Sequence, residues 1–520
     1  MVKRAGGAAA TALLLIACEA SSFDPIPKDF TTDPPPGTPP ALTVDTPKQG
    51  SVALTLTADT GAANDAVVSF GLPFPQGVFG NEKELTLANA KGEPVATATS
   101  VLARWPGDGS IRSVLVAFKA TLAAGATEMW RVDYGTPTTS PDAGKLDPNP
   151  DGPIVVTLPA EHYAKSLVSG VLLPVAANKR FADYDATLER GSGLFAPESF
   201  GLDCSASSGR TYYDSPHARY QRFLRSAVPS HYRAARREVQ WFLQNELTFH
   251  AERTLAVHKC ESASWKPSVP MDWGTLRMML SQGMLDDYLV TGDPAAKEAV
   301  IAMGEAYRVN LPALSGGGEI VLEITERNLG WTLIGLASYF AVDQRNEVRD
   351  AARSLVMRAI AWQARGTSGA FEHDIVRPDP EECGRGQEGA SPFMTSIVVD
   401  GVMDWWLLTA DTATIEPFMK KLATWYETSA ITSDKKAFRY LWNCADNPYD
   451  DAEFADLNVL IAHVFGAAYV LTKDTHWLDF GDTMAVTGLD AVYAGRPKHF
   501  NQAGRSFGKY LGYRALGATP

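Results

Sequence analysis

A turn that recurs through the second half of the sequence constrains the fold more than any other feature. Each copy ends an apolar, aromatic-rich stretch and closes with an aspartate, after which the next predicted helix begins. The copies occupy residues 288–293, 339–343, 406–411 and 469–474. Aspartate is a good helix N-cap, and Pro294 after Asp293 suits a first helical position, where no hydrogen bond is lost. The copies predict helix–turn–helix pairs, with residues 223–226 as a degenerate fifth copy.

The spacing of these turns predicts how the helix pairs assemble. Successive turn aspartates lie 50 to 68 residues apart, which is too long for a tetratricopeptide array. Apolar residues such as Leu457, Leu460, Ile461 and Val464 follow the helical period. We expect inner and outer helices that close into an all-α (α/α) toroid over residues 205–520, the candidate catalytic domain, with a last helix at 498–516.

The preceding part of the chain follows a different period. Val52, Leu54 and Leu56 alternate with small polar residues, and turn signals such as Gly107-Asp108-Gly109 separate similar runs. This pattern predicts a small β-barrel over residues 43–140. Residues 141–204 contain Pro, Gly and Asp clusters, and we expect them to connect the two domains.

Several separated motifs in the β region occur in the order found in a known family. They include residues 67–77, residues 103–112 with Arg104-Trp105-Pro106, and residues 130–135. The region resembles the N-terminal RIFT-barrel domain of the exo-rhamnogalacturonan lyase-like (YetA-type) family. That resemblance implies a barrel followed by an α/α toroid and then a C-terminal β-sandwich. The sequence stops at Pro520, which leaves no room for the sandwich, so we expect this module to be lacking.

The N-terminus predicts export and a lipid anchor. Lys3 and Arg4 precede a short apolar run that ends at Ala17-Cys18, and a spanning helix needs about 20 apolar residues. We therefore predict that residues 1–17 are a lipoprotein signal peptide and that Cys18 is the lipidated residue. Residues 18–42 are predicted to form a Pro-rich tether. The alternative is an ordinary signal cut near Ala20. We expect lipid anchoring to a bacterial membrane, at the outer membrane or cell surface, with no membrane contact except through the anchor.

Charge and cysteine content limit the partners. The net charge is −13, which argues against a nucleic-acid partner because phosphate binding needs clustered Lys and Arg. In an oxidising compartment four cysteines predict two disulfides with three possible pairings, of which Cys204–Cys260 and Cys383–Cys444 are the simplest. We expect a monomer without a cofactor or a resident metal. Ca²⁺ is a possible exception at Asp446, Asn447, Asp450 and Asp451, a cluster without EF-hand spacing.

Four loop regions and the C-terminal helix carry the candidate chemistry, because the long loops of a toroid line its cleft. A Tyr or His beside an Arg can remove a proton next to a uronate carboxylate while the Arg stabilises the charge that develops. The candidate catalytic residues are His373, Tyr213, Arg327, Glu326 and Asp374. The candidate substrate-binding residues are His217, Trp265, Asp272, Trp273, Trp331, His499, Asn501 and Arg505. For each region the alternative is an ordinary packing, capping or solvated residue.

Together these features indicate a surface-anchored enzyme that acts on a polysaccharide. The resemblance implies an exo-acting lyase that cleaves an acidic, pectin-like glycan by β-elimination. Toroids also support hydrolysis, and the first alternative is a glycoside hydrolase with a carboxylate pair such as Glu326 and Asp374. The second alternative is a non-catalytic surface lipoprotein that binds glycan or another partner.

Overall fold

The computed structural model describes residues 46–194, 212–245, 247–249, 255–257, 276, 279–316, 321–374, 388–444, 454–492 and 497–517. The predicted signal peptide, the lipidation site Cys18, the tether and the Ca²⁺ candidates lie outside these ranges. All described residues belong to one compact unit, Gly37–Pro520.

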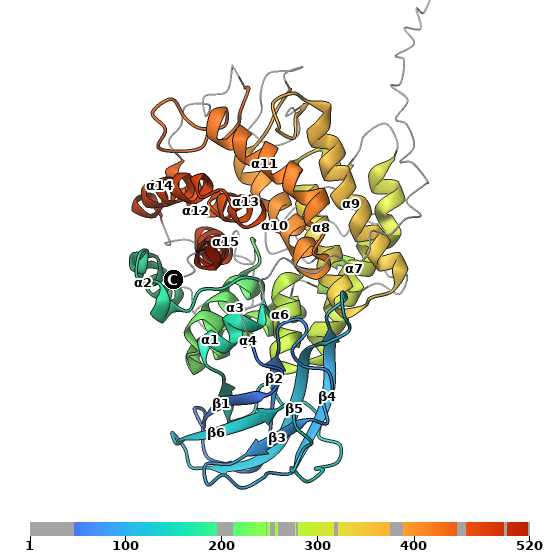
Figure 1. The fold of residues 1–520 in the computed structure, drawn as a ribbon, viewed down its shortest axis with the longest axis vertical. Coiled ribbons are helices and arrows are strands. Elements are labelled where there is room, and N and C mark those ends of the chain that lie inside the picture. Colours follow the sequence, from blue (N-terminus) through green and yellow to red (C-terminus); the bar gives the residue numbers. More distant parts are fainter. Residues whose placement is uncertain are drawn as a thin grey trace, which may run out of the picture. The chain divides into compact units, whose positions relative to one another are not determined.

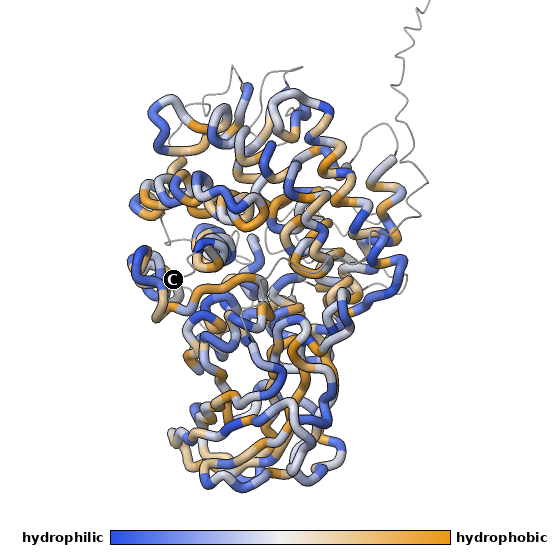
Figure 2. Tube along the Cα trace, viewed as in Figure 1, coloured by the Kyte–Doolittle hydropathy of each residue, from blue (hydrophilic) through white to orange (hydrophobic). Residues whose placement is uncertain are grey.

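Two antiparallel sheets form the N-terminal β domain (Figure 1). One sheet has the order β3 (Leu85–Ala88), β6 (Thr127–Tyr134), β1 (Gly50–Thr57) and β7 (Val155–Thr157); the other has β2 (Ala63–Pro73), β5 (Ile111–Leu122) and β4 (Thr97–Arg104). Hydrophobic and hydrophilic stretches alternate along the strands (Figure 2). Leu54 and Leu56 are buried with Val116, Phe118 and Val132 between the sheets. The predicted β-rich domain is confirmed.

The segment predicted to connect the domains contributes to both of them. Its strand β7 extends the first sheet by pairing with β1, at Leu56 opposite Val156. It then forms α1 (Ala160–Ser166), η1 (Val175–Ala177) and α2 (Ala182–Leu194).

Helices in pairs make up the second domain, as predicted. An inner set consists of α3 (Ser215–Ser226), α6 (Gln282–Thr291), α8 (Glu326–Val342), α10 (Pro392–Thr409), α13 (His463–Thr472) and α15 (Pro497–Gly517). Each inner helix contacts the next, and α15 contacts α3, so this set closes into a ring. An outer set packs on it in the same order: α4 (Pro229–Asn245), α7 (Pro294–Ser315), α9 (Asn346–Arg365), α11 (Thr412–Thr428), α14 (His476–Ala491) and α2.

Short elements join the helix pairs. They are β8 (Leu247–Phe249) with β9 (Leu255–Val257), η4 (Val321–Glu323), β10 (His373–Asp374) with β11 (Glu388–Gly389), η5 (Ala455–Leu457) and α12 (Asn458–Ile461). They lie on the chain between an outer helix and the following inner helix, so they belong to the end of the ring where inner helices begin.

The recurring turn joins each of five inner helices to its outer partner. The carbonyl oxygen of its first aromatic residue accepts a backbone hydrogen bond from the residue that ends the helix, as in Gly292 N to Tyr288 O and Ala410 N to Trp406 O. The aspartate side chains then accept from backbone N–H groups at the start of the next helix; Asp293 accepts from Ala295 at 2.9 Å. The four predicted turns with an aspartate are confirmed, and at the degenerate fifth copy, 223–226, Ala227 N donates to Phe223 O and Val228 N to Ser226 Oγ instead.

One apolar stretch, 455–472, has the length and composition of a membrane span, although we expect no membrane contact except through the lipid anchor. In the structure 83% of it is buried inside the protein. It comprises η5, α12 and α13, so its hydrophobicity is that of the core of the ring.

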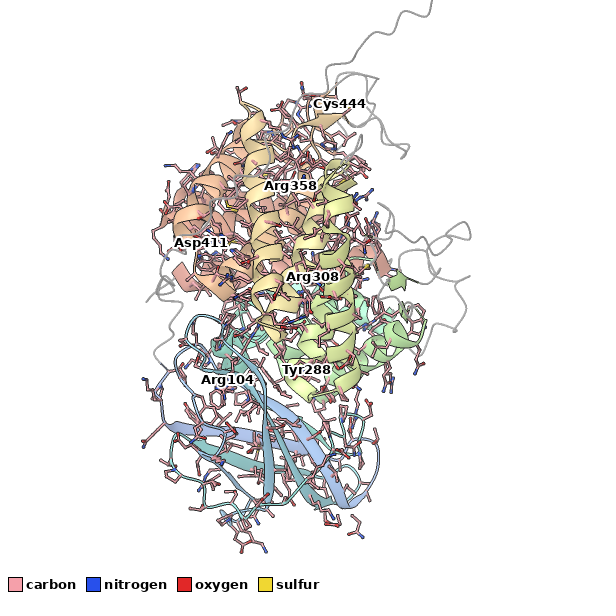
Figure 3. All side chains as sticks on the ribbon, turned by 90° about the vertical axis from the view of Figure 1, so that its right-hand side faces the viewer. Arg104, Tyr288, Arg308, Arg358, Asp411 and Cys444 are labelled. Atoms are coloured by element: carbon pink, nitrogen blue, oxygen red, sulfur yellow. The ribbon has the colours of Figure 1, made fainter. Side chains whose placement is uncertain are left out.

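The β domain packs against the ring through α6. Ser113 Oγ on β5 donates a hydrogen bond to Leu289 O at 2.7 Å, and the Tyr288 hydroxyl donates to Leu102 O at 2.8 Å. Tyr288 and Arg104 mark this junction in Figure 3. A Cβ atom on Gly71 would lie 2.0 Å from Leu289 O, so the backbones of β2 and α6 touch directly.

We expect Gly71→Ala to lower the free energy of unfolding by about 2 kcal/mol, because the added methyl group overlaps a backbone atom that cannot move away alone. Urea unfolding followed by circular dichroism measures this change. Gly80→Ala is the matched control, since a Cβ there has no neighbour within 4 Å. Equal stability of the two variants would show that β2 and α6 are not in direct contact.

Candidate functional site

The interior of the helical ring is polar, although its helices are buried. Residues of α6, α8 and α13 are buried on every face, and helices in that position are normally apolar all round. Ionisable groups nevertheless occupy the interior. They are Asp214, His217, Asp286, Asp400, His463, Arg505 and Lys509, all at most 4% exposed. Burying charge is costly unless the charges are paired, so we take this interior, the lumen, as the candidate site.

Asp400 of α10 is the centre of the buried charges. Its Oδ2 accepts from Arg505 Nη1 at 2.7 Å and its Oδ1 from Lys509 Nζ at 2.9 Å. His463 Nε2 lies 3.4 Å from Oδ1. Burial alone raises the pKa of Asp400, but Lys509 and Arg505 more than offset this effect and hold the pKa below its usual range. Asp400 therefore stays ionised and fixes both cations.

Arg505 extends from this centre toward the beginning of the inner helices. Its Nη2 donates to Gln282 Oε1, and Gln282 Nε2 donates to Asp404 Oδ2 at 2.6 Å. The guanidinium carbon lies 4.7 Å from the centroid of the Trp331 ring. A fixed cation on an aromatic face, beside an amide, forms a polar and apolar surface of the kind that sugars bind.

A second buried pair joins α3 to α6. His217 Nδ1 lies 2.6 Å from Asp286 Oδ2. Burial lowers the pKa of His217 to about 3 and raises the pKa of Asp286 to about 7. Because the imidazole stays neutral, the carboxyl group of Asp286 gains or loses the proton of this pair near neutral pH.

Residues at the start of α8 and α10 form a third group, together with the β10–β11 hairpin. Glu326 is fully buried; its Oε1 accepts from Ser391 N at 2.6 Å and its Oε2 lies 3.9 Å from His373 Nε2. Burial raises the pKa of Glu326. The Nδ1–H of His373 donates to Phe371 O at 3.0 Å, which directs Nε2 toward the carboxylate.

A strained backbone places two tyrosines beside this group. Tyr213 and Asp214 both have left-handed conformations, with φ of 67° and 59°. Non-glycine residues in this region cost free energy and concentrate at functional sites. Asp214 holds the turn by accepting from His217 N and Gly283 N at 3.1 and 3.2 Å. Arg327 Nη1 donates to the Tyr212 hydroxyl at 2.9 Å.

The lumen thus contains most of the predicted site residues that the structure describes. Tyr213, Glu326, Arg327, His373, Trp331 and Asn501 lie at or near the beginning of the inner helices; His217 is in the first turn of α3, and Arg505 lies further along α15. Asn501 Nδ2 donates to Tyr212 O at 3.0 Å. Asp374 is exposed on β10 and His499 is half-buried. Trp265, Asp272 and Trp273 lie outside the described residues.

Cys444, labelled in Figure 3, is the one cysteine among the described residues. It is buried and disulfide-bonded. Its partner and the other predicted pair, Cys204–Cys260, fall outside the described ranges. The pairing Cys383–Cys444 therefore stays a prediction. Within the described part of the chain, no group of three or more His, Cys, Asp or Glu side chains could hold a metal ion.

Sequence reasoning missed the deepest groups of the lumen. They are Asp286, Asp400, Asp404, Gln282 and Lys509, together with Arg112 of the β domain. A signal was present for two of them, because Asp400 and Asp404 interrupt an otherwise apolar helix. The apolar residues around them favour a core helix, in which a buried aspartate needs a polar partner.

Comparisons with known proteins agree on the β domain. The family model of the PcRGLX-like N-terminal RIFT barrel domain matches residues 52–128, which confirms the predicted barrel type for this part of the chain. The sequence matches no curated protein.

Solved structures with a similar course of the chain include three sugar enzymes. Cellobiose 2-epimerase from Spirochaeta thermophila has a TM-score of 0.45 and 15% identity, covering 65% of this chain and 99% of its own. A sugar epimerase from a ruminal bacterium has a TM-score of 0.43 and 13% identity, covering 59% and 85%. Unsaturated glucuronyl hydrolase from Streptococcus agalactiae has a TM-score of 0.43 and 12% identity, covering 71% and 98%.

We expect the free energy of unfolding to decrease between pH 5 and pH 8 through Asp286. Its pKa is about 7 in the folded protein and about 3.9 in an unfolded chain. The folded state therefore retains a proton that the unfolded state has lost, and stability falls as pH rises toward 7. Asp286→Asn cannot ionise, so it should remove on the order of 2 kcal/mol of this pH dependence.

Chemical denaturation at several pH values measures this effect. Asp490→Asn, on the exposed face of α14, is the matched control and should keep the pH dependence of the original protein. An unchanged pH dependence in Asp286→Asn would mean that Asp286 does not hold a proton at neutral pH.

Proposed function

We propose that this protein is a carbohydrate-active enzyme whose site is the lumen at the end where the inner helices begin. One observation carries this proposal: a buried helical ring is lined by fixed charges, an arginine stacked on a tryptophan and several amide and hydroxyl groups. A polar lumen with an aromatic face has the chemistry needed to bind a sugar. The match of the β domain to the PcRGLX-like barrel supports the same conclusion.

The reaction that these groups fit best is β-elimination on a uronate of an acidic, pectin-like polysaccharide. A base removes the proton next to the carboxylate, the bond to the leaving oxygen breaks, a carbon–carbon double bond forms and the leaving oxygen gains a proton. Arg327 and Arg505 are the cations available to stabilise the carboxylate as charge develops on it. Tyr213 and His373 are the candidate bases, and Glu326 orients His373.

The position of the β domain favours an exo-acting enzyme. Arg112 of β5 and residues 168–170 line a cavity beside the late residues of α8 and α10, at the end of the lumen away from the proposed site. A lumen that is blocked at one end admits the end of a chain rather than its middle. The predicted export signal and lipid anchor at Cys18 would keep such an enzyme where polysaccharides occur, outside the cytoplasm.

A second candidate function, glycoside hydrolysis, has a specific observation in its favour. Asp286 has a raised pKa of about 7, whereas the pKa of Asp400 is held low. Two carboxyl groups with opposite shifts are the arrangement that hydrolases use for an acid and a base or nucleophile. This pair differs from the predicted pair of Glu326 and Asp374, because Asp374 is exposed while Glu326 is fully buried.

We expect absorbance near 235 nm to rise when the purified full-length protein digests uronate-containing polysaccharides, because elimination creates a conjugated double bond. Arg327→Ala and Arg505→Met should each lower kcat/KM by about 100-fold, the usual effect of removing one group that stabilises developing charge. Arg131→Ala, an exposed residue on β6, is the control and should retain activity.

Other outcomes of the same digest distinguish the remaining functions. New reducing ends without absorbance would contradict the lyase and favour the hydrolase, in which Asp286→Asn and Asp400→Asn should be inactive. Binding of polysaccharide without either product would contradict both reactions and favour a non-catalytic glycan-binding lipoprotein.

A further inference from the structure

Arg112 on β5 lines a small cavity at the end of the lumen. It is 3% exposed, and its guanidinium carbon lies 4.8 Å from the centroid of the Trp105 ring. Its Nη2 donates to Val168 O at 3.1 Å. Among the described residues, its Nε and Nη1 have no hydrogen-bond partner. A buried cation with two unused donors is costly unless a ligand or water accepts from it.

The unused donors belong to a small cavity, which we call the floor cavity. Its volume is about 30 Å³, and its polar lining is Arg112, Ser169, His217, Gln282, Asp286, Ser338 and Asp404. The late residues of α8 and α10, such as Ala341 and Leu408, form its apolar wall. A space of this size holds one or two water molecules or one small polyatomic group.

The charges around the floor cavity favour an anion when the carboxyl groups of its lining are protonated. Burial raises the pKa of both Asp286 and Asp404. The positive charges of Lys509 and Arg505 lower the pKa of Asp286, which opposes the effect of burial. The negative charges of Asp214 and Asp404 raise the pKa of His217, but burial lowers it further and the imidazole stays neutral. With Asp286 protonated, Arg112 lacks an ionised partner on that side, and the carboxyl O–H is a further donor.

We propose that the floor cavity binds a single carboxylate group, which accepts hydrogen bonds from Arg112 and from the protonated carboxyl group of Asp286. The carboxylate comes either from a small free acid or from the terminal uronate of the glycan, and the second source rests on the proposed function. In both cases the β domain supplies part of the binding site of the helical domain.

The pH dependence of binding follows from the two donors. Below pH 7 Asp286 donates and Arg112 attracts the anion; above pH 7 ionised Asp286 repels it. Carboxylate affinity should therefore fall about tenfold between pH 6 and pH 8.

Formate is the probe, because it is the smallest carboxylate. Calorimetric titration of the full chain should detect formate binding at pH 6 and about tenfold weaker binding at pH 8. Arg112→Met, which removes the charge and keeps the length of the side chain, should abolish the binding. Arg104→Met, an exposed arginine at the end of β4, is the matched control and should bind formate normally.

Asp286→Asn provides a test that does not depend on the folding of the Arg112 variant. Asparagine keeps a donor and cannot ionise, so its formate affinity at pH 8 should equal its affinity at pH 6. Absence of formate binding to the original protein, or equal binding by Arg112→Met, would overturn the proposal.

Galacturonate distinguishes the two sources of the carboxylate. Competition between galacturonate and formate assigns the cavity to the terminal uronate, whereas formate binding without competition assigns it to a free acid; both results support a carboxylate site. Lyase activity without formate binding would refute the floor cavity as a carboxylate site and leave the proposed function intact.

Discussion

The ionised carboxylate of Asp400 is the interaction on which the helical domain depends. It binds Arg505 and Lys509 of α15 and faces His463 of α13, so one side chain of α10 connects three inner helices. Removing one member of a buried ion set leaves the others without compensation, at a cost of several kcal/mol. The same contacts hold Arg505 on the face of Trp331. Stability of the ring and geometry of the candidate site therefore share one cause.

The outer part of the ring is built by a different and more local mechanism. Each turn from an inner to an outer helix satisfies backbone groups through an aromatic carbonyl at one side, and four of the five turns add an aspartate that accepts from a backbone N–H at the other. Because the turns are stabilised by their own hydrogen bonds, the inner faces of the inner helices can carry polar groups. The strained residues Tyr213 and Asp214 lie at the opposite end, where the inner helices begin and the loops are long. The ring thus has its locally stabilised turns at one end and its strained backbone and candidate bases at the other.

The β domain is part of this arrangement rather than an appendage. Its strands touch α6 without intervening side chains at Gly71, and Ser113 bonds to the end of α6. Arg112, the residue before Ser113, reaches the floor cavity. Neighbouring residues on a strand point to opposite faces, so one strand both docks on the helices and supplies a cation to their interior.

The sequence by itself determined the elements with local causes: the alternating strands of the β domain, the helix pairs with their aspartate caps, and the candidates Tyr213, Glu326, Arg327 and His373 in the segments that precede or begin inner helices. Only the tertiary structure decided which polar residues meet inside the ring. Asp400 and Arg505 are 105 positions apart and Arg112 belongs to another domain, so no local pattern identifies them as neighbours. An aspartate in an apolar helix has the same local sequence whether its side chain lies in solvent, caps a helix or lies in a lumen. Closure of the ring determines which of these environments it has.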